Sequence, residues 1–195
     1  PHQMFGAIIK SYYAKKNNID PSKIFVVSVM PCIAKKFERT REDMQGTGFD
    51  DVDAVITTRE LARMIKQAHI EFVELPDSGF DNPMGEATGA AAIFGVTGGV
   101  MEAALRTAAE ILEGKKLERL EFEQVRGEQG IKRACLNIAG KEIKVVVVSG
   151  LNNARKVMDD MKNGKADYDF LEVMACPGGC IMGGGQPIKS SKTRN

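Results

Sequence analysis

Cysteine is the residue type in this sequence that is best suited to metal or redox chemistry, and it occurs four times in 195 residues. Cys176 and Cys180 are separated by three residues in the segment Cys-Pro-Gly-Gly-Cys, which further glycines follow. Two thiols at this spacing can bind one metal centre, and glycine lets the backbone approach such a centre closely. Cys32, in a separate Met-Pro-Cys segment, is a third candidate ligand. Together the three thiols favour an iron-sulfur centre.

Two other interpretations of Cys176 and Cys180 stay open. A disulfide is one, although the balanced charge and the absence of a signal-like segment predict a reducing compartment, where disulfides are rare. Zinc is the other, but zinc ligands are usually spaced more tightly and occur in two pairs. Because the sequence has only two histidines, any metal must be held mainly by sulfur or carboxylate.

Cys135 differs from the other three cysteines. It lies inside an alternating strand candidate without glycine or proline beside it, and a buried free cysteine commonly acts as a small apolar residue. We therefore interpret Cys135 as structural. An all-thiolate 4Fe-4S cube needs four ligands, so the remaining three thiols are one ligand short.

Other side chains near the cysteines could take part in chemistry. Lys35 and Glu38 follow Cys32 by three and six residues, so a helical turn would put both on nearly the same face as the thiol. There a lysine can donate hydrogen bonds to an anionic ligand and a glutamate can pass protons; a solvated charged face is the simpler interpretation. Met30 and Met174, each two residues before a site cysteine, are expected to pack in the core and line a dry pocket.

The overall composition is that of an ordinary globular protein. The 27 Lys and Arg residues nearly balance 26 Asp and Glu residues, and 43% of all residues are hydrophobic. Basic residues do not alternate with aromatic ones as on a nucleic-acid surface, and the apolar stretches are too short to cross a bilayer. We therefore expect a cytoplasmic protein with neither nucleic acid nor membrane as a partner.

Two predicted strands must position the cysteines. The apolar runs Ile24–Met30 and Phe170–Met174 resemble strands that are buried on both faces of a parallel sheet, and each runs directly into a site cysteine. Sites in open α/β sheets assemble at the carboxyl ends of strands, so both strands would deliver their thiols to a functional edge.

The rest of the chain alternates between strand and helix patterns, which is typical of an α/β layer structure. We predict helices over residues 4–13, 60–68 with Thr58 as N-cap, 100–113 ending at Gly114, and about 154–162; strands over 53–57, 117–125, 131–138 and 145–150; and a long loop over 75–99.

Several of these segments are similar to the catalytic domain of the iron-only (FeFe) hydrogenases. MPCIAKKFE (residues 30–38) and EVMACPGGCIMGGGQP (172–187) resemble two of the three signature motifs of that family. DAVITTREL (53–61) and FGVTGGVMEAALR (94–106) resemble the segments between them, so the resemblance covers almost the whole chain.

The resemblance implies two α/β lobes with mainly parallel sheets flanked by helices, with the site in the cleft between the lobes. The expected lobes are residues 1–75 plus 165–195 and residues 76–164. The implied cofactor is the H-cluster, a 4Fe-4S cube bridged to a two-iron centre that carries CO, cyanide and a dithiolate. It would catalyse reversible reduction of protons to hydrogen.

The resemblance also implies roles for individual residues. Cys32 and Cys176 are similar to cube ligands, and Cys180 to the cysteine that bridges the cube and the two-iron centre. Lys35 is similar to a lysine that hydrogen-bonds a cyanide, and Glu38 to a carboxylate of the proton route. The residues implied to pack against the two-iron centre or its CO ligands are Met30, Phe94, Gly95 and Met174.

The implied partners are ferredoxin or accessory iron-sulfur domains as electron donors, hydrogenase maturation proteins, and flanking segments of a longer parent chain. The family's first signature, a Thr-Ser-Cys-Cys-Pro segment followed by tryptophan, is absent from this sequence, which contains no tryptophan. We therefore expect an internal fragment that cannot by itself hold a complete H-cluster or evolve hydrogen. His2 stands where relatives often have glutamine, and Met182 where they often have asparagine.

Three other functions compete with a hydrogenase domain. Narf-like cytosolic iron-sulfur assembly proteins share versions of the two cysteine motifs but have no two-iron chemistry, and the segment 94–106 and the Gln186-Pro187 ending favour the hydrogenases over them. A hydrogen-sensing relative with weak turnover is the second, and an α/β interaction module that uses Cys176 and Cys180 as a redox pair is the third.

Overall fold

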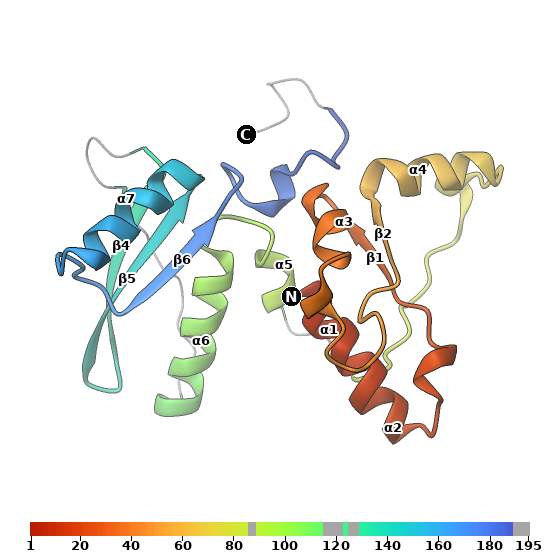
Figure 1. Cartoon of the computed structure of the whole chain (residues 1–195), viewed down its shortest axis with the longest axis horizontal. Helices are drawn as coiled ribbons and strands as arrows, with labels where there is room; N and C mark the ends of the chain where they lie inside the picture. The colour runs from red at the N-terminus through yellow and green to blue at the C-terminus, as the bar shows by residue number, and fades with distance from the viewer. Residues whose placement is uncertain (86–88, 115–122, 125–128, 189–195) are drawn as a thin grey trace. The chain divides into compact units, whose positions relative to one another are not determined.

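A computed structural model describes residues 1–85, 89–114, 123–124 and 129–188. The chain forms two compact units, which Figure 1 shows in ribbon form: unit 1 consists of Pro1–Glu86 and Gly183–Asn195, and unit 2 of Ala87–Met182. Within the described residues, no helix is both long enough and apolar enough to cross a membrane.

Unit 1 begins with a helical segment that leads into a small sheet. Its helical segment consists of α1 (His2–Ile8), the π-helical turn η1 (Ile9–Tyr13) and α2 (Ala14–Lys16), so the predicted helix over residues 4–13 is confirmed. The elements that follow are η2 (Pro21–Lys23), β1 (Val27–Met30), α3 (Ala34–Arg39), η3 (Glu42–Met44), β2 (Ala54–Thr57), α4 (Thr58–Gln67) and η4 (Phe72–Glu74).

The sheet of unit 1 is a parallel pair, in which β1 runs beside β2 from Val27 opposite Ala54 to Met30 opposite Thr57. The expectation that β1 is buried on both faces is wrong for the described chain, because Val27 is 48% and Val29 42% exposed, whereas Ser28 is buried. The physical reason is that the described sheet has two strands, and only one face of β1 is covered within the unit.

Helix α4 begins at the carboxyl end of β2 with a capping box. The Thr57 hydroxyl accepts the Glu60 N–H at 3.2 Å, and the Glu60 carboxylate accepts the Thr57 N–H at 2.7 Å. The N-cap is thus Thr57 and not Thr58, one residue earlier than predicted. This reciprocal pair satisfies two backbone donors that the first turn of a helix leaves without intrahelical partners.

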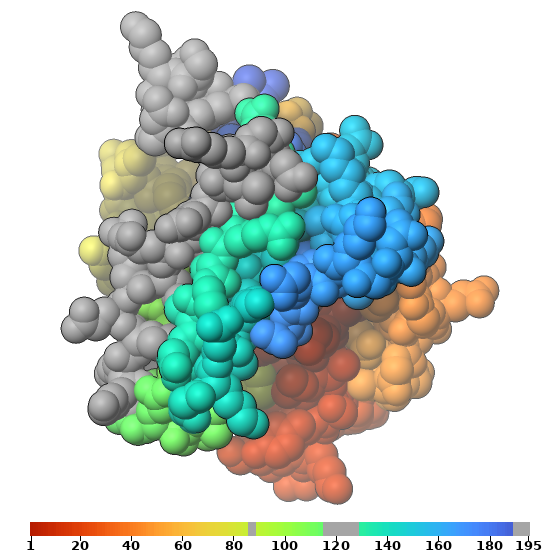
Figure 2. Space-filling view, turned by 90° about the vertical axis from the view of Figure 1, so that its left-hand side faces the viewer, coloured from red at the N-terminus to blue at the C-terminus, as the bar shows by residue number. Residues whose placement is uncertain are grey.

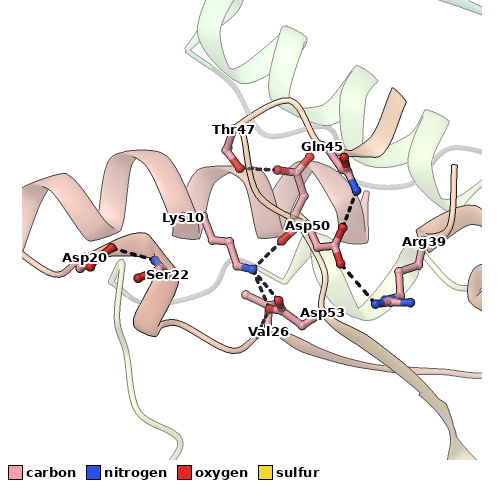
Figure 3. Close-up of polar contacts among 10 residues, drawn as sticks. Lys10, Asp20, Ser22, Val26, Arg39, Gln45, Thr47, Asp50 and Asp53 are labelled. Carbon is pink, nitrogen blue, oxygen red and sulfur yellow. Dashed lines mark hydrogen bonds and ion pairs between the residues drawn. The ribbon is translucent and has the colours of Figure 1, made fainter. Parts of the chain in front are cut away.

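A buried lysine attaches the N-terminal helical segment to the sheet of unit 1 (Figure 3). Lys10, which is 3% exposed, donates to an Asp53 carboxylate oxygen at 2.8 Å and to the Asp50 carbonyl. The Asp53 carboxylate also accepts the Val26 N–H at 2.6 Å, just before β1. Since burying an unpaired charge is costly, these contacts fix where the helix lies on the strands.

Unit 2 is an α/β structure with a mixed sheet. Its elements are α5 (Ala90–Ile93), α6 (Gly99–Glu113), β3 (Glu123–Gln124), β4 (Ile131–Ile138), β5 (Lys141–Ser149), α7 (Leu151–Lys162), β6 (Phe170–Met174) and η5 (Cys180–Met182). The described strands are ordered β3-β4-β5-β6, with β5 and β6 parallel and β4 antiparallel to both of its neighbours.

The α/β class is therefore confirmed, with parallel pairing at β1–β2 and β5–β6 and antiparallel pairing around β4. Short turns can join antiparallel strands, and a turn at Ala139 and Gly140 does so between β4 and β5. Apart from β3, the strand predicted over residues 117–125 lies outside the described residues.

The core of unit 2 lies on both faces of β5. Val145 and Val147 pack with the apolar side of α6, while Val146 and Val148 pack with that of α7. Helix α6 ends at Gly114, whose φ of +65° is the left-handed conformation of a helix C-cap, as predicted. By contrast with β5, the final strand β6 exposes 45% of Phe170 and 44% of Val173, so its predicted burial on both faces is wrong.

Cys135 is exposed, which corrects the interpretation of this residue as a buried core cysteine. It pairs across the strands with Lys144, on the part of β4 that lies outside the apolar cluster formed with α7. Figure 2 shows this side of unit 2, where the strands of the β4–β5 hairpin (teal) reach the surface with α7 (blue) beside them.

The two units divide the chain differently from the expected lobes. Residues 165–182 belong to unit 2, because β6 pairs with β5 along its whole length from Phe170 to Met174. The residues from Gly183 onward belong to unit 1. The two cysteine motifs are therefore distributed over both units.

Candidate functional site

The Cys176–Cys180 loop follows the carboxyl end of β6 in unit 2, as the sequence pattern predicts. Its backbone turns back through Gly178 and Gly179, with φ angles of +84° and +96°, and the Gly179 N–H donates to the Cys176 carbonyl at 3.0 Å. Cys176 is half-buried and Cys180 exposed, and no disulfide is present among the described residues.

The loop at Phe94–Thr97 packs directly against the cysteine loop within unit 2. The Ile181 N–H donates to the Gly95 carbonyl at 2.9 Å. A Cβ atom added to Gly179 would lie 2.5 Å from that same carbonyl oxygen and 2.6 Å from the Thr97 nitrogen. Only glycine fits such a close approach, so residue 179 joins two segments that are far apart in the sequence.

Glu172 supports this pair of loops, a role that no motif in the sequence indicates. One of its carboxylate oxygens accepts the Gly98 N–H and the other the Met101 N–H, both at 2.7 Å. These donors are at the start of α6, where a negative charge stabilises the helix. The signal in the sequence was an acidic residue inside the apolar run of β6.

Cys32 lies in unit 1 between β1 and α3, and the glycine run at 183–185, near the end of the second motif, packs against this segment. The Gly185 N–H donates to the Pro31 carbonyl at 2.6 Å, and a Cβ atom on Gly185 would lie 2.9 Å from the Thr57 Cβ. The Arg59 guanidinium donates to the Gly184 carbonyl at 2.7 Å and holds the same run in place. No pattern in the sequence indicates this role of Arg59.

The charged residues after Cys32 form a network inside unit 1. The predicted helical turn is present as α3, and Lys35 donates to one oxygen of Glu38. The other oxygen lies 2.9 Å from His2 Nε2, while His2 Nδ1 lies 3.0 Å from Ser28 Oγ. Burial acts to raise the pKa of Glu38, but Lys35 and His2 lower it overall, so Glu38 is a carboxylate at neutral pH.

Each unit thus gathers part of the predicted set of site residues. Unit 1 holds Met30, Cys32, Lys35 and Glu38, and unit 2 holds Phe94, Gly95, Met174, Cys176 and Cys180. Met174 is 8% exposed, in keeping with the expected packing, and Phe94 is 40% exposed. In the part of the chain that the structure describes, no three His, Cys, Asp or Glu side chains are gathered in a metal-binding group.

Comparison with known proteins gives these arrangements a family. The family described as "Iron only hydrogenase large subunit, C-terminal domain" matches residues 1–184. The chain belongs to this family. Among the curated iron-only hydrogenases, the periplasmic Fe hydrogenase large subunit of Nitratidesulfovibrio vulgaris is 54% identical over 188 residues, which are 96% of this chain.

A solved structure and a more distant relative extend the comparison. An FeFe-hydrogenase structure from Chlamydomonas reinhardtii matches with a TM-score of 0.80 and 39% identity over 98% of this chain. A cytosolic Fe-S cluster assembly factor, narfl, from Xenopus tropicalis is 31% identical over 191 residues. The iron-only hydrogenases and the cytosolic Fe-S cluster assembly factors are thus both similar to this chain, and the sequence identity is higher for the hydrogenases.

The chain spans less than half of the curated relatives' length, namely 45% of the Nitratidesulfovibrio hydrogenase subunit and 40% of the assembly factor. It covers 56% of the solved Chlamydomonas chain.

The hydrogenase family implies an iron-sulfur H-cluster, and the residues of this chain fit such a group. The candidate donors are thiols, the soft ligands that iron-sulfur clusters use. Gly178 and Gly179 give the Cys176–Cys180 loop a backbone that a cluster can approach closely. Beside it, the buried Thr97 hydroxyl has no hydrogen-bond partner among the described residues, so a polar atom is left for a bound group.

Proposed function

We propose that this chain is the part of an FeFe hydrogenase catalytic domain that binds the H-cluster, and that the whole protein reversibly reduces protons to hydrogen. The observation that carries this proposal is the contact between the Cys176–Cys180 loop and the Phe94–Thr97 loop, made through Gly179. It brings the thiol motif and the segment that holds Phe94 and Gly95 together within unit 2, which supports an iron-sulfur site at this place.

In this proposal the thiols hold the metal. Cys32 and Cys176 would bind the 4Fe-4S cube as thiolates, and Cys180 would bridge the cube to the two-iron centre. When bound, the H-cluster supplies the iron at which protons and electrons combine to form hydrogen. The glycines of the loop turn the backbone so that two thiols on one short segment can bind the same cluster.

Lys35 and Glu38 would supply hydrogen bonds and protons. The Lys35 ammonium can donate to an anionic ligand such as a cyanide while it also donates to Glu38. Glu38 contacts both Lys35 and His2, so a proton can move along either hydrogen bond. This pairing holds the Lys35 ammonium on α3, which begins two residues after Cys32.

The remaining site residues would exclude water. Met30, Met174 and Phe94 are apolar, and methionine is a flexible, polarisable packing residue. Gly95, whose carbonyl is engaged by Ile181, presents backbone without a side chain that would occupy the space of CO ligands. A dry site strengthens the electrostatic interactions within it.

The electron donors that we propose are ferredoxin or accessory iron-sulfur domains, and assembly of the cluster would need maturation proteins and flanking segments of a longer chain. The cytoplasmic location stays a prediction, since a relative at 54% identity is named periplasmic. Anaerobic hydrogen metabolism is part of the same proposal.

The alternative function is that of a narf-like iron-sulfur assembly protein without two-iron chemistry. The 31% identity to the Xenopus assembly factor supports it less well than the 54% identity to the Nitratidesulfovibrio hydrogenase supports hydrogenase function.

Infrared spectroscopy of the full-length protein, purified after maturation, tests the proposal. We expect CO and cyanide bands, and we expect Cys180→Ser to abolish them because it removes the bridging thiolate. Cys135→Ser is the matched control: Cys135 is exposed on β4, so this variant should keep the bands. An iron-sulfur signal without CO and cyanide bands would favour the assembly protein, and bands that survive in Cys180→Ser would contradict the bridging role.

A further inference from the structure

His2 is a buried titratable residue that enters the proposed chemistry only as a hydrogen-bond partner of Glu38. It is 9% exposed, and both of its ring nitrogens lie within hydrogen-bond distance of polar side chains. Nδ1 lies 3.0 Å from Ser28 Oγ in β1, and Nε2 lies 2.9 Å from Glu38 Oε1 in α3. His2 therefore ties α1 to the two elements that come directly before and after Cys32.

The Glu38 carboxylate is fully engaged in this arrangement. Its Oε1 atom faces His2, while its Oε2 atom accepts from Lys35 one helical turn earlier. Two partners on different oxygens leave the carboxylate one orientation, and that orientation in turn determines where the Lys35 ammonium lies. With side chains 24% and 22% exposed, Glu38 and Lys35 are shielded enough for these contacts to persist.

The pKa shifts of His2 and Glu38 fit a neutral His2 imidazole that donates a hydrogen bond to the Glu38 carboxylate. Burial lowers the pKa of His2 below its usual 6.5, and although Glu38 acts to raise it, Lys35 acts to lower it. These are the charged side chains that act on the imidazole, and Ser28 from β1 does not titrate. At neutral pH the Ser28 hydroxyl then donates to Nδ1, and Nε2–H donates to Glu38.

We propose that His2 is a positioning residue, which holds the Glu38 carboxylate and through it the Lys35 ammonium in place on α3, the helix that follows Cys32. The contact between His2 and Glu38 belongs to the fold of unit 1 and is independent of any cluster. Its consequence for a bound anionic ligand rests on the proposed function. A side-chain amide can also donate to Glu38, whereas an apolar side chain of similar size cannot.

The first test measures the contact itself in the 195-residue chain. The only other histidine is His69, so His69→Gln identifies the imidazole signals of His2 in a pH titration followed by NMR. We expect His2 to titrate below 6.5, and Glu38→Gln to move its titration to still lower pH because a charge that favours the protonated form is lost. A His2 titration that Glu38→Gln leaves unchanged would overturn the proposal.

The same titration has a consequence for stability. Because the folded state binds the His2 proton less readily than the unfolded state, the free energy of unfolding falls as the pH drops through 6.5 toward the pKa of folded His2. His2→Gln removes this component, so its loss of stability over that interval should be smaller than that of the unaltered chain.

The second test uses the cluster-loaded full-length protein. We expect His2→Leu to shift a cyanide band in the infrared spectrum and to lower turnover at least tenfold, and His2→Gln to restore both. In His2→Gln, the turnover rate should no longer show the decrease at acidic pH that accompanies protonation of His2. Cyanide bands and turnover in His2→Leu that match the unaltered protein would contradict the role in positioning.

The two tests separate failure of the inference from failure of the proposed function. If the unaltered protein shows no cyanide bands, the proposed function is wrong, whereas the NMR result still decides whether His2 holds Glu38. If the bands are present but neither His2→Leu nor Glu38→Gln changes any signal, the positioning role is wrong and the proposed function stands.

Discussion

Gly179 makes the closest approach between the two loops of unit 2, and alanine at this residue has no space for its methyl group. The added Cβ would lie 2.5 Å from the Gly95 carbonyl oxygen, and the φ of +96° is itself unfavourable for a residue with a side chain. Neither contact partner is a side chain that can rotate away, since both are backbone atoms. The loops must therefore separate or shift.

Gly178 offers a matched control for this prediction. It has a similar φ of +84°, but its Cβ would meet the flexible side chain of Met182 at 2.9 Å. We expect Gly179→Ala to lower the free energy of unfolding by about 1–3 kcal/mol more than Gly178→Ala, which is the usual cost of overpacking. Urea denaturation followed by circular dichroism measures both, and equal effects of the two substitutions would refute the close-contact argument.

Among individual residues, the sequence predicted those that could bind a metal better than those that hold the site in place. Cys32, Cys176 and Cys180 stand out by residue type and spacing, because thiols are rare and chemically distinctive. Glu172 and His2 do not stand out, since one carboxylate or imidazole among many polar residues has no local pattern. Their partners lie in other elements, and only the folded chain brings them together.

Among the elements, the N-terminal helical segment depends on the ion pair between Lys10 and Asp53. Their side chains are 2% and 19% exposed, so removal of the carboxylate would leave a buried ammonium with one partner fewer. We expect Asp53→Ala to lower the free energy of unfolding by about 3 kcal/mol, the lower end of the cost of breaking a buried pair, because Asp53 keeps some access to water.

The exposed pair of Arg41 and Asp43 provides the comparison, because its side chains are 49% and 58% exposed. Asp43→Ala should change the stability by less than about 1 kcal/mol. Hydrogen exchange of the Val26 amide, which donates to Asp53, reports locally on the same contact. Equal stability losses in the two variants would show that Lys10 does not need its partner.

The elements themselves were largely predictable, while their burial was not. β1 and β5 are both rich in valine, yet Val27 and Val29 of β1 are exposed, whereas Val145–Val148 of β5 are buried. A run of β-branched residues predicts an extended strand, because this conformation suits their side chains. Whether its faces are covered depends on helices supplied from elsewhere, as α6 and α7 cover β5.

For the whole molecule, the number of cysteines limits what the 195-residue chain can bind. Three cysteines lie in the motif segments, and Cys135 is in β4. Since an all-thiolate cube needs four ligands, we expect the isolated chain, after maturation, to show no complete set of CO and cyanide bands and no hydrogen evolution. Gas chromatography of hydrogen measures the second, and robust hydrogen evolution by this chain alone would disprove the expectation.

Although it predicted a loop where α5 lies, the sequence by itself determined the family, most of the described helices and strands, and the thiols at the carboxyl ends of β1 and β6. It could do so because periodicity and propensity are local properties and because the cysteine motifs are long and chemically unusual. Only the tertiary structure decided that Gly179 meets Gly95, that Gly185 meets Pro31, and that His2 holds Glu38. These contacts join residues far apart in the chain, and which distant segments meet depends on how the elements pack, which no local pattern records.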